Sequence, residues 1–190
     1  MSSTAYTVDL EDIKFVLFDQ LDIDKRLGAA EKYEDFDQDT YESILEESKN
    51  IAEQVLAPIN GPGDRQGCTL DDEGNVKTPD GYAEAWRTIA EGGWIGITSS
   101  PEVGGMGLPH CVGVATVEMS IGAACAFEMY PGLTGAAARI IHHYGPEDVR
   151  IDYATRMFSG EWGGTMCLTE AGAGSSVGDN RCKANRTDEA

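Results

Sequence analysis

Apolar residues recur at steps of three and four over most of the first 160 positions, which is the spacing of amphipathic helices. The first such stretch runs from Asp9 to Leu27 and is followed by Gly28, so it predicts one helix with a stop signal behind it. Asp39 is the predicted N-terminal cap of a second helix, which we expect to end at Pro58. The beginning of the chain is therefore predicted to form two helices.

The helical period disappears over residues 57–80, which hold four Gly and three Pro. This composition predicts a long loop, with a small hairpin around residues 72–75. Pro79 then opens a predicted helix that Gly92 and Gly93 close. Residues 94–109, rich in glycine, are predicted to form an irregular connector.

Two helices are predicted at about residues 109–125 and 131–143, and their small, apolar and almost uncharged side chains indicate burial on several sides. Another predicted helix begins at Pro146 and ends at Gly160. Beyond this helix the helical pattern ends, and residues 162–169 are predicted to form a buried strand. A lone buried strand leaves its backbone groups unpaired, so we expect that the chain stops inside a second domain.

Charge and composition narrow the classes of protein. The chain has 190 residues with 14 Lys and Arg against 33 Asp and Glu, which gives 14 − 33 = −19. This charge disfavours binding to nucleic acid or to anionic membrane surfaces. The five cysteines form no CxxC pair, and His142 and His143 point about 100° apart on a helix, so neither a disulfide framework nor a metal site is predicted. With no secretory signal and no stretch of about 20 apolar residues, we expect a cytoplasmic protein without membrane insertion.

The most informative stretch is MCLTEAGAGSS, residues 166–176. A strand that runs into a loop of small residues exposes backbone N–H groups, and Gly172 and Gly174 lack side chains that would hold a ligand away. The loop is thus a candidate site for a phosphate-bearing cofactor, and an ordinary flexible turn is the alternative. It does not fit a P-loop, because no lysine follows the glycines, and its GxGxxxG spacing fits the dinucleotide fingerprint poorly.

Three stretches together resemble the acyl-CoA dehydrogenase family. SPEVGGMGLP at residues 100–109 is similar to the PxxxGGxG turn of that family. GPEDVRIDYATRMFSGEW at 145–162 resembles its helix and SGEW turn, and MCLTEAGAGSS resembles its flavin-binding CxTEPxAGSD. The stretches GDRQGC and TPDGYAEAWRTIAEGGW further resemble the larger subfamily that includes 3-methylmercaptopropionyl-CoA dehydrogenase.

The resemblance implies a mainly α fold, with an N-terminal helical domain followed by the first strand of a truncated β domain. Residues 1–160 would form the helical domain and residues 161–190 would begin the incomplete middle β domain. It also implies FAD as cofactor, an acyl-CoA substrate and, in the complete enzyme, an electron-transfer flavoprotein as partner. A homo-oligomer or a complementing subunit is expected.

Carried over by residue, the resemblance assigns cofactor contacts to the strand and loop. The expected set is Met166, Cys167, Leu168, Thr169, Gly174 and Ser175. Ser175 would also lie beside the substrate's pantetheine arm. Two positions depart from the family pattern, since Ala171 replaces the usual Pro and Ser176 the usual Asp.

Two classes of function follow. The first is the N-terminal portion of a flavin-dependent acyl-CoA dehydrogenase, which forms a 2-enoyl-CoA from an acyl-CoA and is expected to be inactive alone. No residue of the chain matches the family's catalytic glutamate, so no catalytic residue is assigned. The second is a non-catalytic acidic helical interaction or assembly module, or the product of a split gene.

Overall fold

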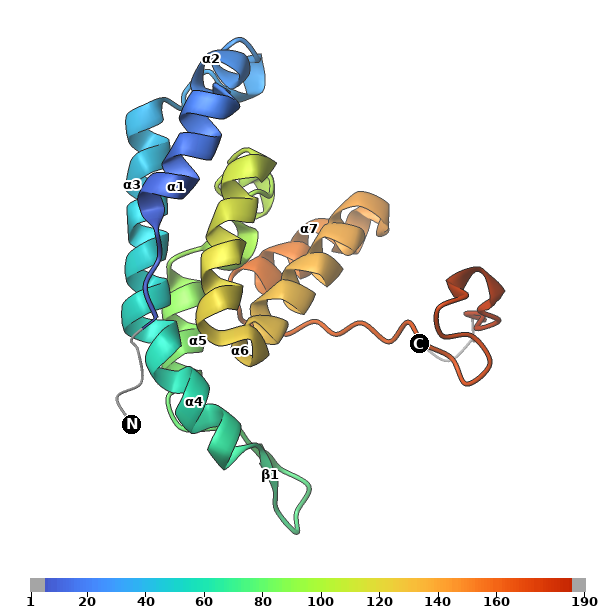
Figure 1. The fold of residues 1–190 in the computed structure, drawn as a ribbon. Helices are drawn as coiled ribbons and strands as arrows, with labels where there is room; N and C mark the ends of the chain where they lie inside the picture. Colours follow the sequence, from blue (N-terminus) through green and yellow to red (C-terminus); the bar gives the residue numbers. More distant parts are fainter. Residues whose placement is uncertain (1–5, 186–190) are drawn as a thin grey trace.

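The computed structural model describes residues 6–185, and its main body is built from helices (Figure 1). The α-helices in this range are α1 (Leu10–Lys14), α2 (Ile23–Gly28), α3 (Gln38–Ile51), α4 (Ala57–Gln66), α5 (Tyr82–Glu91), α6 (His110–Tyr144) and α7 (Glu147–Phe158). The π-helical turns are η1 (Phe15–Gln20) and η3 (Ala52–Leu56), and the 3-10 turns are η2 (Glu31–Tyr33), η4 (Trp94–Gly96), η5 (Pro101–Val103) and η6 (Val177–Asp179). The mainly α fold class is confirmed.

The N-terminal stretch is not the single helix that its spacing predicts. After α1 and η1 the chain breaks at Asp22, which has the left-handed backbone conformation (φ 50°), and α2 follows. Aspartate tolerates that conformation better than most residues. The break lets both Leu17 and Ile23, on either side of it, face the core.

A long helical rod made of α3, η3 and α4 replaces the predicted helix and part of the predicted loop. The cap of α3 is Asp37 rather than Asp39, and its carboxylate accepts a hydrogen bond from the Thr40 N–H at 2.9 Å. Pro58 does not end the rod, because η3 shifts the hydrogen-bond register and places this proline in the first turn of α4. A first-turn residue needs no intrahelical partner for its N–H group, so proline is tolerated there.

The predicted hairpin is confirmed beyond α4. β1 (Thr69–Leu70) and β2 (Val76–Lys77) form an antiparallel pair, and the Asp71 carboxylate accepts hydrogen bonds from the turn between them. The helix α5 and the irregular connector after it also match their predictions, except that α5 begins at Tyr82, behind Gly81, and not at Pro79. In the connector, backbone hydrogen bonds pair residues 96–99 with residues 106–108, so its glycine-rich chain folds back on itself.

The central helix α6 covers both apolar helices that the sequence predicts. Ala124 has a non-helical backbone (φ −153°, ψ 75°), so α6 consists of two helices joined at a kink. The kink lies within one residue of the predicted end at 125, whereas the second helix starts earlier than predicted and runs through Pro131. Each half also leaves apolar side chains exposed, so burial on several sides was only partly right; these are Val114, Val117, Ile121, Met129, Tyr130 and Ile140.

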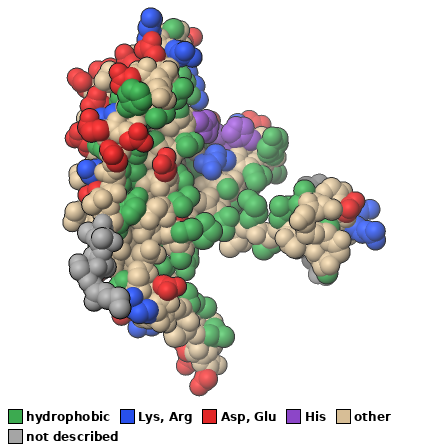
Figure 2. All heavy atoms as spheres, viewed as in Figure 1, with side chains coloured by type: hydrophobic (Ala, Val, Ile, Leu, Met, Phe, Trp, Pro, Cys, Tyr) green, Lys and Arg blue, Asp and Glu red, His purple; other side chains and the backbone are tan. Residues whose placement is uncertain are grey.

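The helix α6 lies against α3, α4, α5 and α7, and the hydrophobic core forms among these helices. By length and composition α6 could cross a membrane, which the sequence analysis did not expect. Core helices of globular proteins meet the same criterion, and the kink and the packing of α6 fit that role. Acidic side chains gather over the part of the surface built by α1, α2 and α3 (Figure 2).

The chain leaves the helices after α7 as an extended segment that leads to a separate small lobe (Figure 1). The prediction of a buried strand at residues 162–169 was wrong. In the structure this segment forms no ladder with any strand within residues 6–185, and almost all of its residues are exposed. A strand is buried only when neighbouring strands pair with it, and the described part of the chain supplies none.

Candidate functional site

The residues expected to hold a cofactor all lie on the extended segment and the small lobe. Met166 and Leu168 have 50% and 51% of their surface exposed, and Cys167 is exposed as well. Thr169, Gly174 and Ser175 are also exposed. The structure therefore places the candidate residues in one continuous stretch, directed to solvent.

Hydrogen bonds of Glu170 hold the small lobe together. Its backbone exchanges two hydrogen bonds with Ala173, each 3.1 Å long, and this pairing forms the tight turn. Its carboxylate accepts hydrogen bonds of 2.8 Å from the N–H groups of Arg181 and Cys182. These two bonds favour the charged form and hold the pKa of the carboxyl below its usual range.

The loop leaves room for a ligand at its glycines. A Cβ added at Gly172, Gly174 or Gly178 would meet no atom within 4 Å. Asn180 ties the lobe back to the extended segment, because its amide donates to the Leu168 carbonyl at 2.9 Å. The expected cofactor residues thus lie on one segment, residues 166–180, which we call the bracket. Hydrogen bonds of Glu170 and Asn180 fix its shape, and its outer face is exposed to solvent.

A second candidate region lies inside the helical body, along α6. A cavity of about 270 Å³ lies between residues 94–98 and α6, and a smaller cavity of about 30 Å³ adjoins it. The two share four lining residues, which are Trp94, Val117, Glu128 and Pro131. A cavity of 30 Å³ is large enough for an ordered water molecule.

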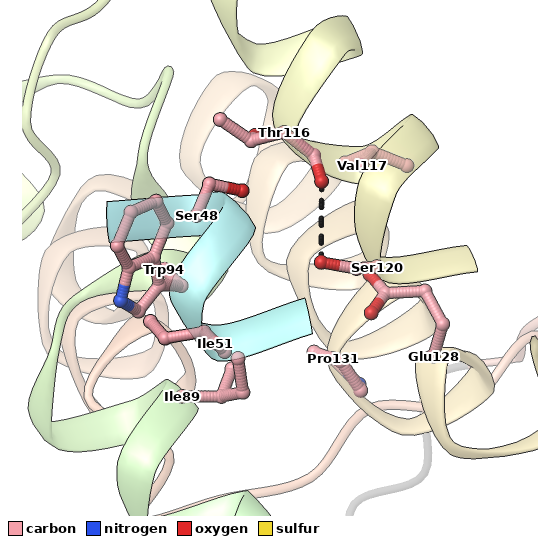
Figure 3. A pocket seen from close by; sticks show the side chains of 9 residues that line it. All are labelled: Ser48, Ile51, Ile89, Trp94, Thr116, Val117, Ser120, Glu128 and Pro131. Atoms are coloured by element: carbon pink, nitrogen blue, oxygen red, sulfur yellow. Dashed lines mark hydrogen bonds between the residues drawn. The ribbon is translucent and has the colours of Figure 1, made fainter. Parts of the chain in front are cut away.

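Glu128 is the one acidic side chain that lines both cavities (Figure 3), and the larger cavity is also lined by His110 and Arg139. It is 8% exposed, although no lysine, arginine or histidine of residues 6–185 forms an ion pair with it. Loss of hydration raises the pKa of its carboxyl to about 7. The side chain points toward Ser120, whose hydroxyl donates to the Thr116 carbonyl at 3.2 Å (Figure 3). Such back-bonding bends helices, and the kink of α6 follows four residues later.

Replacing Glu128 by Gln is expected to change how stability depends on pH. The folded pKa of this carboxyl lies above its unfolded value, so the unfolded state releases the proton first. The wild-type protein should therefore lose stability as pH rises from about 4.5 to about 7, on the order of 3 kcal/mol from this group. The Glu128→Gln variant should lack that contribution, which urea unfolding at pH 5 and pH 8 would measure.

Glu118→Gln is the matched control, because Glu118 is an exposed glutamate on the same helix. It should keep the wild-type difference in unfolding free energy between the two pH values. If Glu128→Gln kept it too, the buried carboxyl would not be the source.

Glu128 is not among the predicted site residues, although its place in the sequence is unusual. It is the sole charged residue between Met119 and Ala138, within an otherwise apolar stretch. Charged residues are seldom buried without a partner, so an isolated glutamate within an apolar stretch indicates an unusual environment. No cluster of three or more His, Cys, Asp or Glu side chains suited to a metal ion occurs within residues 6–185.

Comparisons with known proteins place the chain in a family. Residues 38–161 match the family described as acyl-CoA dehydrogenase, N-terminal domain. This match covers the helical body from α3 to the end of α7. The chain belongs to the acyl-CoA dehydrogenase family.

Curated relatives extend the likeness over almost the whole chain. A 3-methylmercaptopropionyl-CoA dehydrogenase of Ruegeria pomeroyi is 32% identical over 97% of this chain and 31% of its own length. A butyryl-CoA dehydrogenase of Syntrophomonas wolfei is 34% identical over 99% of this chain and 31% of its own length. A broad-specificity linear acyl-CoA dehydrogenase of Mycobacterium tuberculosis is 36% identical over 94% and 29%. The chain spans about a third of the length of these relatives.

Proposed function

We propose that the chain is the N-terminal portion of an FAD-dependent acyl-CoA dehydrogenase, which converts an acyl-CoA thioester to a 2-enoyl-CoA. The observation that carries this proposal is the family match over residues 38–161, continued by the relatives through the MCLTEAGAGSS loop. Residues 1–160 would be the helical domain, and 161–190 the beginning of the middle β domain. The end of the family match at residue 161 supports that boundary.

The exposed bracket fits a flavin cofactor in its chemistry. Extended backbone at Met166–Thr169 offers N–H and C=O groups to the edge of a flat polar ring, apart from the Leu168 carbonyl, which accepts from Asn180, and the Thr169 hydroxyl adds a donor. Gly174 leaves the space that a pyrophosphate needs close to the backbone, and Ser175 offers a hydroxyl beside it. FAD, when bound, would accept the hydride that leaves the acyl β carbon.

The cavity beside α6 is the candidate wall of the acyl pocket. Apolar side chains and glycines line most of this 270 Å³ cavity. Gly113, Gly132 and Gly135 have no side chains that would fill it from the α6 side. The apolar part of this lining can accept a hydrocarbon chain, and the polar lining residues are Thr98, His110, Glu128 and Arg139. The carboxyl of Glu128, protonated below its raised pKa, would line this cavity as a neutral hydrogen-bonding group.

The partners follow from the same proposal. The complete cytoplasmic enzyme would pass its electrons to an electron-transfer flavoprotein and would assemble as a homo-oligomer or with a complementing subunit. In this scheme the chain positions cofactor and substrate, and the proton at the α carbon would be removed by a carboxylate outside these 190 residues.

The proposal is tested in a fusion of this chain to the part of the Syntrophomonas wolfei butyryl-CoA dehydrogenase that follows the matched region. Gly174→Val in this fusion would put a branched side chain where the pyrophosphate approaches. The affinity for FAD should fall about tenfold or more, because one phosphate contact is worth about 1.5–3 kcal/mol, and the flavin that the purified protein retains, measured from its visible absorbance, should fall with it.

Gly28→Val is the matched control, since a Cβ at Gly28 on α2 likewise meets no atom within 4 Å. It should leave the flavin content unchanged. Equal flavin content in both variants would show that the loop is an ordinary turn and would count against the proposal.

A further inference from the structure

A further pocket, separate from the loop and from the two cavities along α6, opens between α5 and the second half of α6. Its volume is about 390 Å³, within the range of small-molecule sites. The residues that line it are Thr78, Tyr82, Ala83, Trp86, Arg87, Phe127 and Tyr130. Four of these seven are aromatic, and we call the site the aromatic pocket.

The aromatic walls are held in place by contacts with one another and with the end of α7. Tyr82 packs edge to face against Phe127 with ring centres 5.5 Å apart, and against Tyr130 at 6.1 Å. The indole N–H of Trp86 donates to the Gly160 carbonyl at 3.2 Å, which fixes the ring from the α7 side. Rings that are fixed in advance lose little entropy when a ligand binds between them.

Arg87 is the one charged residue among those that line the pocket. It is exposed, and no carboxylate within residues 6–185 lies close enough to form an ion pair with it. Burial raises the pKa of the Tyr82 and Tyr130 hydroxyls, so both phenols stay neutral at neutral pH. In a chain of net charge −19, the pocket therefore presents a free cation beside neutral rings.

We propose that the aromatic pocket binds a small aromatic anion, with its flat ring against Trp86 and Tyr130 and its anionic group on Arg87. Aromatic rings prefer edge and offset contacts with other rings, which the walls offer. The guanidinium presents two parallel N–H donors to a carboxylate, sulfonate or phosphate. A neutral apolar ligand would use the rings alone, and an aliphatic anion would use Arg87 alone.

The proposal is independent of the flavin site, because none of its residues belongs to the loop or to the α6 cavity. Isothermal titration calorimetry of the 190-residue chain would compare 1-naphthalenesulfonate with the neutral 1-naphthalenemethanol. The sulfonate should bind about tenfold more tightly, because a hydrogen bond to a charged partner is worth about 1.5–3 kcal/mol. Arg87→Gln should remove this tenfold preference and leave the affinity for the alcohol unchanged.

Arg26→Gln is the control, since it removes the same charge from an exposed position on α2. It should keep the preference for the sulfonate. Ala83→Leu would fill the mouth of the pocket from an exposed helical position and should weaken both probes about tenfold. Equal affinities for the two probes, equal effects of the two arginine variants, or full binding to Ala83→Leu would each overturn the proposal.

Discussion

The purified 190-residue chain is expected to show no turnover with any acyl-CoA and to be colourless. Its expected cofactor residues, from Met166 to Ser175, are open to solvent in the structure. Binding sites bury most of the surface of a small ligand, and a single exposed bracket buries little of it. The sequence also predicts no counterpart in this chain of the family's catalytic glutamate. Dye reduction with butyryl-CoA and a visible absorbance spectrum would measure both properties.

A complete acyl-CoA dehydrogenase, assayed side by side, is the positive control for the dye and the substrate. Turnover by the isolated chain would mean that a catalytic base lies within these residues. A yellow protein with one flavin per chain would mean that the bracket suffices to bind the cofactor.

Gly105→Ala is expected to destabilise the fold by about 3 kcal/mol or more. Gly105 lies in the glycine-rich connector, and a Cβ there would collide with the backbone carbonyl of Ser99. Backbone atoms cannot turn aside as a side chain can, so the paired connector would have to open. That change should lower the melting temperature by about 10 °C, given about 2–4 °C for each kcal/mol in a chain of this size.

Gly132→Ala is the matched control on α6, because a Cβ there meets no atom within 4 Å. It should be neutral or stabilise by about 0.5–1 kcal/mol, since alanine favours a helix more than glycine does. Thermal unfolding of the two variants would separate the collision from the general effect of adding a methyl group. Similar melting temperatures for both would show that the connector is not tightly paired.

Local signals in the sequence predicted the elements that local forces determine. The helix at α5 follows from Pro79 and the two glycines behind it, and α7 follows from Pro146. The hairpin follows from the turn residues between β1 and β2. In each case a start or stop residue and an apolar period agree, and the tertiary structure did not override them.

Elements whose form depends on the rest of the molecule were predicted less well. The break at Asp22 allows two apolar residues to reach the core, and the turn η3 lets the helix pass Pro58. Neither has a local sequence signature, because a π-turn or a left-handed residue is stabilised by packing. Residues 162–169 read as a buried strand from their composition, whereas burial requires partner strands.

The candidate site, too, could be predicted from the sequence only in part. The loop with Gly174 and Ser175 was recognised from its motif, and its role in binding a cofactor stays a prediction. Glu170, which ties the loop together through two backbone N–H groups, stood inside the motif without being assigned that function. Glu128 is an isolated charge in an apolar stretch of the sequence, but only the fold shows that its carboxyl lines a cavity.

The visible spectrum of the fusion to the butyryl-CoA dehydrogenase remainder tests the central claim most directly. If this chain is the N-terminal portion of a flavin-dependent acyl-CoA dehydrogenase, the purified fusion should be yellow, with one flavin per polypeptide. Anaerobic addition of butyryl-CoA should then bleach the flavin band. A fusion that unfolds cooperatively on heating and yet is colourless, or whose band butyryl-CoA leaves unchanged, would contradict the claim.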